Sequence, residues 1–505
     1  MTYKNRKQIT DIDEIRRINE YNQFRRRVQL FGGNSNLFVE GLSTRASITG
    51  AFAEERDYGL SLQNAGYNSV AFTEGNDSFT SGVATSLLNY VSDLDNIKLN
   101  NYSSPIQVGS LTNWSQIASG QYHSLTLNTS GQLFSCGYNN VGQLGLNNLT
   151  HRSSPVQVGS LSNWSQVASG QIHSLTLNTS GQLFSCGYNI YGQLGLNDLT
   201  WRSSPVQVGS LSNWSNIVGG YSHSLAINTS NQLFSWGDNG SGQLGLNDII
   251  HRSSLVQVGT LSNWSQIAGG GGYSLAINTS KQLFSWGLNP NGQLGLNDVT
   301  YRSSPVQVGT LSNWSKVACG YHSLAINTSG QLFSWGYNTS GQLGLNDITH
   351  RSSPVQVGSL SNWSLLAGGQ YYSLTLNTFG QLFSWGRNTN GQLGLNDITH
   401  RSSPVQVGTL SNWSKIAGGA NHSLALNTSN QLFSWGLNAT GQLGLNDQSY
   451  RSSPVQVGSL SNWSQVAGGS FHSQATNSST QLFTASTLNP YVGRPITDMT
   501  YIIYD

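Results

Sequence analysis

Short apolar or alternating runs, each bounded by glycine, asparagine or serine, follow one another through most of the chain. In one stretch they cover residues 305–308, 314–318, 322–326 and 331–335. Runs of about 4–8 residues with alternating polarity and turn residues between them predict β-strands joined as hairpins. We therefore expect an all-β structure built from groups of four strands.

The group of four strands recurs along the chain with a nearly constant period. A tryptophan in the sequence Asn-Trp-Ser marks each copy, at Trp114, Trp164, Trp214, Trp264, Trp314, Trp363, Trp413 and Trp463. The spacing is 50 residues with one interval of 49, and the missing residue falls near Cys319. This repetition predicts a single β-propeller, in which four-stranded blades pack face to face around a central channel.

The number of blades follows from counting two features of the repeat. The group of four strands, which we begin at the Pro-Val-Gln-Val run, occurs eight times between residues 103 and 483. The sequence Gly-Gln-Leu-Gly occurs seven times, and we interpret it as the linker between consecutive blades. Seven linkers joining eight groups favour eight blades. A closed ring also needs its two ends paired so that no edge strand remains, and the flanking segments are the available material.

The repeat resembles that of a known family. The run Leu-Phe-Ser-Trp-Gly-x-Asn-x-x-Gly-Gln-Leu-Gly, then Pro-Val-x-Val and Ala-Gly-Gly-x-x-His-Ser-Leu, closely resembles the repeat of the regulator-of-chromosome-condensation family over residues 101–487. The resemblance implies a propeller, usually seven-bladed, so seven and eight both stay open. It implies no single function, because similar propellers serve as exchange factors for small GTPases, chromatin binders, photoreceptors and enzyme inhibitors. The clustered Gly-Trp-Arg-His motif of the photoreceptors is absent.

The sequence divides into three segments: an N-terminal extension (residues 1–100), the propeller (101–487) and a tail (488–505). Residues 1–60 hold 10 of the 23 Lys and Arg residues, so the extension differs in kind from the repeats. A helix is expected over about residues 10–30, with an apolar stripe formed by Ile12, Ile15, Ile18, Tyr21, Phe24 and Val28. This helix either packs on the propeller as a cap or docks on a protein partner or a second copy.

Composition limits the classes of partner. Charged residues make up 9% of the chain, against about 25% in typical soluble domains. The formal net charge of +2 creates no field that would collect nucleic acid, so a nucleic-acid partner is not expected. No apolar run is long enough to span a bilayer and no secretory signal is recognised, so we expect neither membrane insertion nor export by that route.

Histidines and cysteines recur at repeat positions and are therefore interpreted as structural. One class of histidine opens the His-Ser-Leu strand, where Tyr273 and Tyr372 substitute in two copies; it comprises His123, His173, His223, His322, His422 and His472. A position that accepts tyrosine predicts a hydrogen-bonded core residue, not a metal ligand. A second class, His151, His251, His350 and His400, alternates with Trp201, Tyr301 and Tyr450 and suggests an aromatic platform. Cys136 and Cys186 replace a repeated tryptophan and are expected to be core thiols.

Near-identical blades supply only symmetric arrangements, whereas catalysis needs a unique one, so we expect no catalytic residues, cofactor or metal site and no enzyme. The repeated charges have a local explanation. Six aspartates each stand four residues before an arginine, in the pairs Asp198 and Arg202, Asp248 and Arg252, Asp298 and Arg302, Asp347 and Arg351, Asp397 and Arg401, and Asp447 and Arg451. These pairs predict local ion pairs, and the first copy departs from the pattern with Asn148 before Arg152.

Differences between copies fall mainly before Gly-Gln-Leu-Gly and before His-Ser-Leu. Because neighbouring strands of a blade run in opposite directions, these two loops emerge at the same end and form one variable-loop face. The candidate partner-binding residues there are Tyr122, Val141, Ile172, Tyr191, Tyr221, Asn291, Tyr321, Tyr371, Asn390, Asn421 and Phe471. Neutral polar and aromatic residues suit recognition of a protein or a glycan. Drift in exposed loops explains the variation equally well.

These observations predict a non-catalytic binding or structural propeller. A surface poor in charge and near-identical tandem copies, which resemble those of phage-encoded propellers, suggest a phage virion protein. It would be a decoration or host-contact appendage anchored to the particle by its N-terminal segment. The alternative is a cytoplasmic protein-binding propeller, such as an exchange factor for a small GTPase or a chromatin-associated scaffold.

Overall fold

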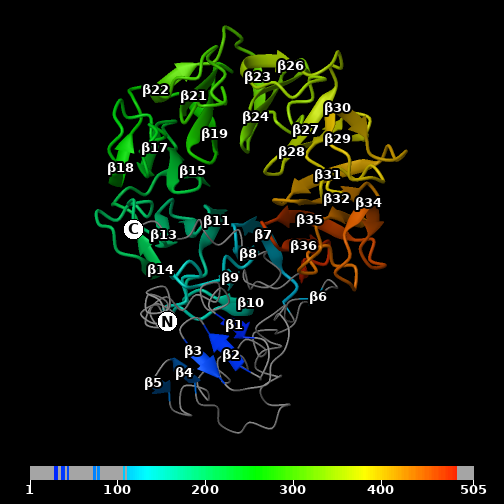
Figure 1. Cartoon of the computed structure of the whole chain (residues 1–505). Coiled ribbons are helices and arrows are strands. Elements are labelled where there is room, and N and C mark those ends of the chain that lie inside the picture. The colour runs from blue at the N-terminus through cyan, green and yellow to red at the C-terminus, as the bar shows by residue number, and fades with distance from the viewer. Residues whose placement is uncertain are drawn as a thin grey trace. The chain divides into compact units, whose positions relative to one another are not determined.

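The computed structural model describes residues 28–31, 36–39, 42–44, 72–74, 77–79, 106–107 and 111–485. The chain forms two compact units, Asn101–Pro490 and Met1–Asn100 together with Tyr491–Asp505. The described part of the larger unit consists of eight four-stranded antiparallel sheets that follow one another around a ring (Figure 1). The expected β-propeller is therefore confirmed, with the eight blades of the repeat count and not the seven usual in the family.

Each blade contributes one strand to the wall of the central channel, and these innermost strands begin at the Asn-Trp-Ser tryptophan. They are β7 (Trp114–Ser119), β11 (Trp164–Ser169), β15 (Trp214–Gly219), β19 (Trp264–Gly269), β23 (Trp314–Cys319), β27 (Trp363–Gly368), β31 (Trp413–Gly418) and β35 (Trp463–Gly468). The second strands are β8 (His123–Asn128), β12 (His173–Asn178), β16 (His223–Asn228), β20 (Tyr273–Asn278), β24 (His322–Asn327), β28 (Tyr372–Asn377), β32 (His422–Asn427) and β36 (Ser473–Asn477). All residues of the second strands are buried, because both faces of a blade pack against neighbouring blades.

The third and fourth strands complete each blade toward the outside of the ring. The third strands are β9 (Leu133–Gly137), β13 (Leu183–Gly187), β17 (Leu233–Gly237), β21 (Leu283–Gly287), β25 (Leu332–Gly336), β29 (Leu382–Gly386), β33 (Leu432–Gly436) and β37 (Leu482–Ala485). The fourth strands are β10 (Arg152–Gln157), β14 (Arg202–Gln207), β18 (Arg252–Gln257), β22 (Arg302–Gln307), β26 (Arg351–Gln356), β30 (Arg401–Gln406), β34 (Arg451–Gln456) and β6 (Ile106–Gln107). The fourth strands are the most exposed, as expected for the outer edge of a blade.

The strand grouping expected from the sequence is wrong by one strand. The sequence pattern predicts that each group of four strands begins at the Pro-Val-Gln-Val run. In the structure that run forms the fourth strand of the preceding blade, as in the pairing of Ser185 with Val206. Gly-Gln-Leu-Gly consequently lies between the third and fourth strands of one blade and does not link two blades. A period alone fixes the length of a repeat, whereas the hydrogen bonds decide where a blade begins.

This offset also closes the ring. The first Pro-Ile-Gln run of the propeller, β6, pairs with β37 through Gln107 opposite Phe483 and Ile106 opposite Thr484. β6, the first strand of the propeller in sequence, thus becomes the fourth strand of the last blade. The first strands of the last and first blades, β35 and β7, lie side by side (Figure 1). The expected pairing of the two ends is confirmed.

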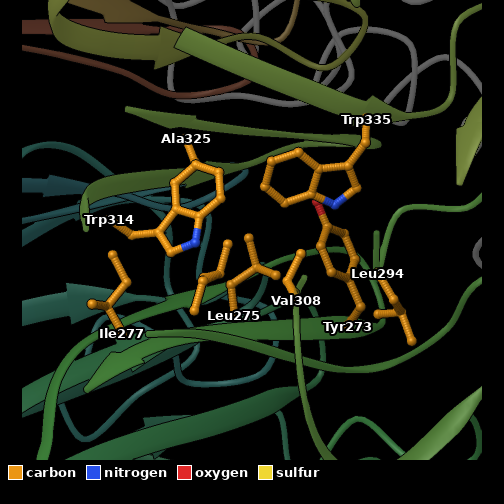
Figure 2. Close-up of a cluster of buried hydrophobic side chains, with 9 residues drawn as sticks. Tyr273, Leu275, Ile277, Leu294, Val308, Trp314, Ala325 and Trp335 are labelled. Carbon is orange, nitrogen blue, oxygen red and sulfur yellow. The ribbon is translucent and has the colours of Figure 1, made fainter. Parts of the chain in front are cut away.

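The hydrophobic core is divided into clusters that lie between consecutive blades. In the cluster of Figure 2, Tyr273, Leu275 and Val308 come from one blade and Trp314 and Trp335 from the next. The two indole rings of the second blade point toward the aliphatic side chains of the first (Figure 2). Every blade is thereby held by its neighbours, which is why a single blade of this sequence would leave apolar surface exposed.

A ring of hydrogen bonds passes through all eight blade interfaces. The residue that opens each second strand contacts the serine that follows the equivalent residue in the next blade. The contacts join His123 Nε2 to Ser174 Oγ (3.0 Å), His173 Nε2 to Ser224 Oγ (2.9 Å), His223 Nε2 to Ser274 Oγ (3.1 Å), Tyr273 Oη to Ser323 Oγ (3.0 Å), His322 Nε2 to Ser373 Oγ (2.7 Å), Tyr372 Oη to Ser423 Oγ (3.1 Å), His422 Nε2 to Ser473 Oγ (2.9 Å) and His472 Nε2 to Ser124 Oγ (2.8 Å). These histidines and tyrosines are buried, so their expected role as hydrogen-bonded core residues is confirmed.

The glutamine of Gly-Gln-Leu-Gly extends this network, because its backbone carbonyl accepts hydrogen bonds from the next blade. The serine hydroxyl donates to that carbonyl at seven interfaces, as from Ser224 to Gln193 (2.9 Å). The tryptophan of the third strand donates its indole N–H to the same oxygen at five interfaces, as from Trp236 to Gln193 (2.8 Å). Where Cys186 replaces this tryptophan, the indole hydrogen bond is absent, and the thiol of Cys186 contacts the carbonyl oxygen of Gln143 at 3.7 Å instead.

The interface between the last and first blades, the seam, has fewer of these contacts. Among the described residues its core cluster contains Trp114, Phe134 and Leu482, while Val108, the counterpart of Val308 in the cluster of Figure 2, lies outside them. No Gly-Gln-Leu-Gly follows β37 in the sequence, so the glutamine carbonyl is missing from this interface. Gln474 stands where other blades have leucine, and within the described residues both of its buried amide atoms are without a hydrogen-bond partner. The described part of the seam therefore lacks the glutamine carbonyl contact of the other interfaces and buries an unsatisfied amide.

The described strands of the smaller unit form one antiparallel sheet in the order β1 (Val28–Phe31), β2 (Asn36–Val39), β3 (Leu42–Thr44), β4 (Phe72–Glu74) and β5 (Asp77–Phe79). The helix expected over about residues 10–30 is wrong at its end, because Val28 begins β1 and pairs with Val39. The β-branched valine and the Gly32-Gly33 pair that follows β1 in sequence suit a hairpin better than the last turn of a helix. The other stripe positions lie outside the described residues, as does the tail from 488 to 505.

The seam should open more readily than the other interfaces. In hydrogen exchange under native conditions, we expect amides of β35, β36 and β7 to exchange at least tenfold faster than the matching amides of β19, β20 and β23. The reason is the missing glutamine carbonyl and the unsatisfied buried amide of Gln474. Equal protection of both sets would contradict this account of the seam.

Stability should fall steeply in mild acid. Burial lowers the pKa of His123, His173 and His422 to about 3, and that of His223, His322 and His472 to about 4. Since the unfolded chain takes up protons near pH 6.5, this contribution to stability is complete above about pH 6.5 and is lost as the pH falls toward 4. Each histidine contributes a slope of up to about 1.4 kcal/mol per pH unit. We expect the free energy of unfolding to fall continuously from pH 6.5 to 4.5 in urea titrations.

The chain itself suggests a control for this pH dependence. His223→Tyr introduces the residue that already stands at positions 273 and 372, so the interface contact can be retained. The variant should show a smaller loss of stability between pH 6.5 and 4.5, by about one proton taken up on unfolding. A free energy of unfolding that does not change over this range, in either protein, would show that the histidines are not buried in the neutral form.

Candidate partner-binding face

The two variable loops of each blade emerge at the same end of the ring. The first residue after the third strand bonds to the loop between the first and second strands, as Tyr138 N to Tyr122 O (2.9 Å) and Tyr188 N to Ile172 O (3.1 Å). The variable-loop face, defined as these first-to-second and third-to-fourth loops, is thus a structural unit. The shared position of these loops does not by itself show that they bind a partner.

The central channel opens on this face through a cavity of about 250 Å³. Its wall is formed mostly by glycines of the first-to-second loops, with Gln121, Gln171, Gln370 and Tyr221 among the larger lining residues. No charged side chain lines it. The glycines are required by close packing: a Cβ atom on Gly170 would lie 2.0 Å from Cε1 of His173. A side chain at this position would therefore clash with the imidazole of the hydrogen-bond ring.

A tyrosine patch lies beside the channel opening and is formed by Tyr221, Tyr321, Tyr371 and Tyr337. The ring centroids of Tyr321 and Tyr371 are stacked 4.8 Å apart, and Tyr221 meets Tyr321 edge-on at 6.5 Å. Tyr337 is tilted against Tyr371 at 5.9 Å. Tyr221 and Tyr321 belong to blades separated by one other blade, whose loop Gly270–Gly272 carries no side chain that would keep them apart. The patch therefore depends on the glycine loop beneath it.

The hydroxyl groups of Tyr321 and Tyr371 stay protonated at neutral pH. Burial is the main cause that raises the pKa of both to about 12; the neighbouring Tyr221 raises the pKa of Tyr321 further, and Tyr321 raises that of Tyr371. The guanidinium of Arg387 lies 5.5 Å from the ring centroid of Tyr371, a cation–π geometry. The patch thus offers neutral hydrogen-bond donors and acceptors, aromatic faces and one cation.

Three of the eleven candidate residues thus come together in the tyrosine patch, and two others are wrong as contact residues. Tyr122 is 7% exposed, because its ring is stacked on Phe471 at 5.6 Å and meets Tyr138 at 6.1 Å. Val141 is 5% exposed in a tight turn where its N–H donates to Gln143 Oε1 (3.1 Å). Variation between copies therefore does not by itself indicate exposure, because both positions vary although both side chains are buried.

The remaining candidates are half-buried and occupy two kinds of loop. Ile172, Asn421 and Phe471 lie in first-to-second loops, whereas Tyr191, Asn291 and Asn390 lie in third-to-fourth loops. The backbone N–H groups of the latter three each donate to the glutamine side chain two residues on, as Asn291 to Gln293 Oε1 (3.0 Å). These six lie on the variable-loop face but outside the tyrosine patch.

The repeat family is decided by comparison of the sequence with known families. The repeat described as Regulator of chromosome condensation (RCC1) repeat matches residues 130–177, 180–227, 230–277, 281–326, 329–376, 380–426 and 429–475. The chain belongs to the RCC1 repeat family. A second RCC1 repeat profile matches residues 114–143, 214–243, 264–293, 314–342 and 413–442. Comparison with curated protein sequences gave no significant match.

Solved structures of other RCC1-type propellers show the same fold. Human WBSCR16 is 23% identical with a TM-score of 0.57, over 70% of this chain and 99% of that one. Prp20p from Saccharomyces cerevisiae is 22% identical with a TM-score of 0.55, over 72% and 93%. The yeast RCC1 (Prp20) bound to Kap60 is 21% identical with a TM-score of 0.56, over 75% and 95%. At these identities the likeness concerns the fold alone.

The histidines between the third and fourth strands of this RCC1-type propeller brace their loops. The ring of His151 stacks on Tyr138 at 4.5 Å and that of His350 on Tyr337 at 5.0 Å, as expected for an aromatic platform. The Nδ1 atoms of both accept a backbone N–H, from Asn139 and Asn338, each at 2.9 Å. The six expected ion pairs between aspartate and arginine are all present and are partly exposed. The loops are thereby rigid supports for whatever the face binds.

Sequence reasoning missed a set of exposed aliphatic residues on the outer part of these loops. The residue after the repeated aspartate or asparagine is apolar in six blades and is 56–65% exposed: Leu149, Leu199, Ile249, Val299, Ile348 and Ile398. The seventh copy has Gln448 there. The available signal was an apolar residue kept at a turn position, where solvent exposure would normally select a polar one.

The opposite face of the RCC1 ring consists of nearly invariant turns. Asn128 and Asn178 are not free surface positions there: each accepts the backbone N–H of the glutamine four residues on and is buried. Phe379 is an exception to the repeat, since other copies have serine at this position and its ring is 70% exposed. Phe379 is therefore the better site for a control substitution on that face.

The described residues show no sign of a metal centre or a reactive thiol. No group of three or more His, Cys, Asp or Glu side chains is placed to hold a metal ion in this part of the chain. Burial raises the pKa of Cys136 and Cys186 to about 12, so these thiols stay protonated and are poor nucleophiles, in keeping with core residues. Among the same residues, no helix is long and apolar enough to cross a bilayer.

Proposed function

We propose that this RCC1-type propeller is a non-catalytic binding protein that engages a protein partner through its variable-loop face. The observation that carries the proposal is the tyrosine patch beside an uncharged channel opening. Tyrosine supplies a large, rigid contact area with a polar end at low entropic cost, which is why it is enriched in binding surfaces. The invariant hydrogen-bond ring beneath the loops provides a rigid scaffold for such a surface.

Related structures support a protein as the partner class. The structure of Prp20p is described together with its binding properties to Gsp1p and histones, and that of yeast RCC1 as bound to Kap60. These partners belong to those proteins, and the likeness to them shows only the fold. A cytoplasmic propeller that binds a protein is nevertheless favoured over a glycan-binding one. Exchange activity on a small GTPase is a narrower version of this proposal and is tested by a nucleotide-release assay.

The virion role expected from the sequence receives no support from the comparisons, and it stays a hypothesis. It rested on low surface charge and on near-identical tandem copies that resemble those of phage-encoded propellers, and the docking helix proposed as the anchor has a stripe that, apart from Val28, lies outside the described residues. Mass spectrometry of purified phage particles tests the virion role directly. Absence of the chain from particles would leave the cytoplasmic binding protein as the better account, and its presence would support the virion role.

The variable-loop face can be tested with substitutions that the repeat already contains. Tyr221→Gln and Tyr371→Ser introduce residues found at the equivalent positions of other copies, such as Gln171 and Ser222, so the fold should be retained. Photo-crosslinking from position 221 identifies the partner in extracts of the native host. We expect the double variant to weaken binding of that partner at least tenfold in isothermal titration, because aromatic anchors dominate interface energies.

The matched control is Phe379→Ser on the opposite face, which removes an exposed aromatic ring and restores the repeat residue. It should leave the affinity within about twofold of the original protein. Equal loss of affinity in both variants, or a loss only in Phe379→Ser, would assign the binding surface to the wrong face. Loss of binding after enzymatic removal of glycans from the partner would support the glycan alternative.

A further inference from the structure

The first two blades of the ring each depart from the repeat at a position near the interface between them. In the first blade Asn148 replaces the repeated aspartate, and in the second blade Cys186 replaces the repeated tryptophan. A groove with a volume of about 400 Å³ lies between these two blades on the outer wall. Its lining includes Arg152, Leu161, Trp164, Phe184 and Pro205.

The change from aspartate to asparagine releases an arginine. In the second blade, Asp198 Oδ1 accepts the N–H of Thr200 (2.8 Å) while Oδ2 accepts the guanidinium of Arg202. Asn148 Oδ1 keeps the equivalent bond to Thr150 N (2.9 Å), but its Nδ2 is a donor and bonds to Leu146 O (3.0 Å). A donor cannot accept a hydrogen bond from another donor.

Arg152 is consequently the exception among seven equivalent arginines. The six others are each paired with an aspartate, whereas within the described residues the guanidinium of Arg152 has neither an ion pair nor a hydrogen bond to protein. It is half-buried and lines the groove. A cation beside apolar side chains, without a carboxylate of its own, is a site where an incoming carboxylate would form a charge-assisted bidentate contact.

The second departure places a smaller side chain next to residues that line the groove. In the blade interfaces that keep tryptophan, the indole lies against the glycine of Leu-Gly: a Cβ on Gly245 would lie 2.9 Å from Trp286 Nε1 and 3.2 Å from Pro305 Cδ. At the first interface the corresponding neighbours of Gly145 are the smaller Cys186 and Pro205. The core cluster here has five buried residues, against eight at the next interface. The smaller side chain of Cys186 thus lies behind Gly145 and Pro205, which line the groove, although Cys186 itself does not line it.

We propose that this groove binds an acidic side chain flanked by apolar residues, presented by a segment of a protein partner. The carboxylate pairs with Arg152, and the flanking apolar side chains pack on Trp164, Phe184 and Leu161, of which Leu161 is 46% exposed. Trp164 and Phe184 meet edge-on at 5.0 Å and present a rigid aromatic wall. The site lies on the outer wall and does not use the tyrosine patch, so it is independent of the proposed function.

The test uses the full chain and two capped tripeptides, acetyl-Leu-Glu-Leu-amide and acetyl-Leu-Gln-Leu-amide. Binding is followed by NMR of protein labelled with 15N at the arginine side chains. We expect the acidic peptide to bind about tenfold more tightly than its neutral counterpart, with the shift concentrated at Arg152 Nε. Arg152→Gln should remove this tenfold preference. Equal affinity for the two peptides, or no binding of the acidic one, overturns the proposal.

Two variants separate the site from general effects on charge and folding. Asn148→Asp restores the repeat residue and should pair Arg152, lowering affinity for the acidic peptide about tenfold without unfolding the protein. Arg202→Gln removes an arginine that is already paired in the neighbouring blade and should leave the affinity unchanged. Equal effects of Arg202→Gln and Arg152→Gln would show that the peptide responds only to net charge. Tyr221→Gln should not alter peptide binding, so this test and that of the variable-loop face can fail separately.

Discussion

The structure depends on one hydrogen-bond chain that crosses every blade interface. A buried imidazole or phenol reaches the serine of the next blade, and at seven interfaces that serine donates to a glutamine carbonyl of the preceding blade. At five interfaces with histidine, the serine proton is used by the carbonyl, so the imidazole must be the donor through Nε2–H. The geometry thereby requires a neutral histidine of one tautomer, with Nδ1 left without a proton. Burial, glycine spacing and acid sensitivity all follow from that requirement.

The same constraint explains where the repeat can vary. Gly170 has no room for a side chain because the imidazole of His173 lies against it, and the glutamine carbonyl must stay within reach of the next serine and tryptophan. Residues between these fixed points, such as Tyr221 and Tyr371, project from the ring and are free to differ. The scaffold and the variable-loop face are thus two consequences of one network. Substitutions at positions that are otherwise constant in the repeat, such as Asn148 and Cys186, are rarer and more informative.

Much of the fold could be predicted from the sequence because it repeats. The period, the strand order within a copy and the eight blades follow from counting tryptophans such as Trp114 and Trp463. The start of a blade could not be predicted, because pairing of Val206 with Ser185 is a choice between two equally periodic alternatives. Val28 was assigned to a helix from its spacing, although the stripe is also compatible with a strand at its end.

The candidate site was predictable only in part. Variation between copies located loops that share one face of the ring and three residues of the tyrosine patch, but it could not distinguish buried Tyr122 from exposed Tyr221. Asn148 was visible as a departure from the pattern, yet its effect on Arg152 depends on which side-chain atoms face each other. Such effects appear only once the loops are folded.

The hydrogen-bond ring can be observed directly through the protonation of its histidines. Long-range 1H–15N correlation NMR at pH 7 distinguishes the two neutral tautomers from the charged ring. The account predicts that His123, His173, His223, His322 and His422 are neutral with the proton on Nε2. Finding these residues charged, or protonated on Nδ1, would contradict the proposed network and with it the explanation of how eight blades are held in one ring.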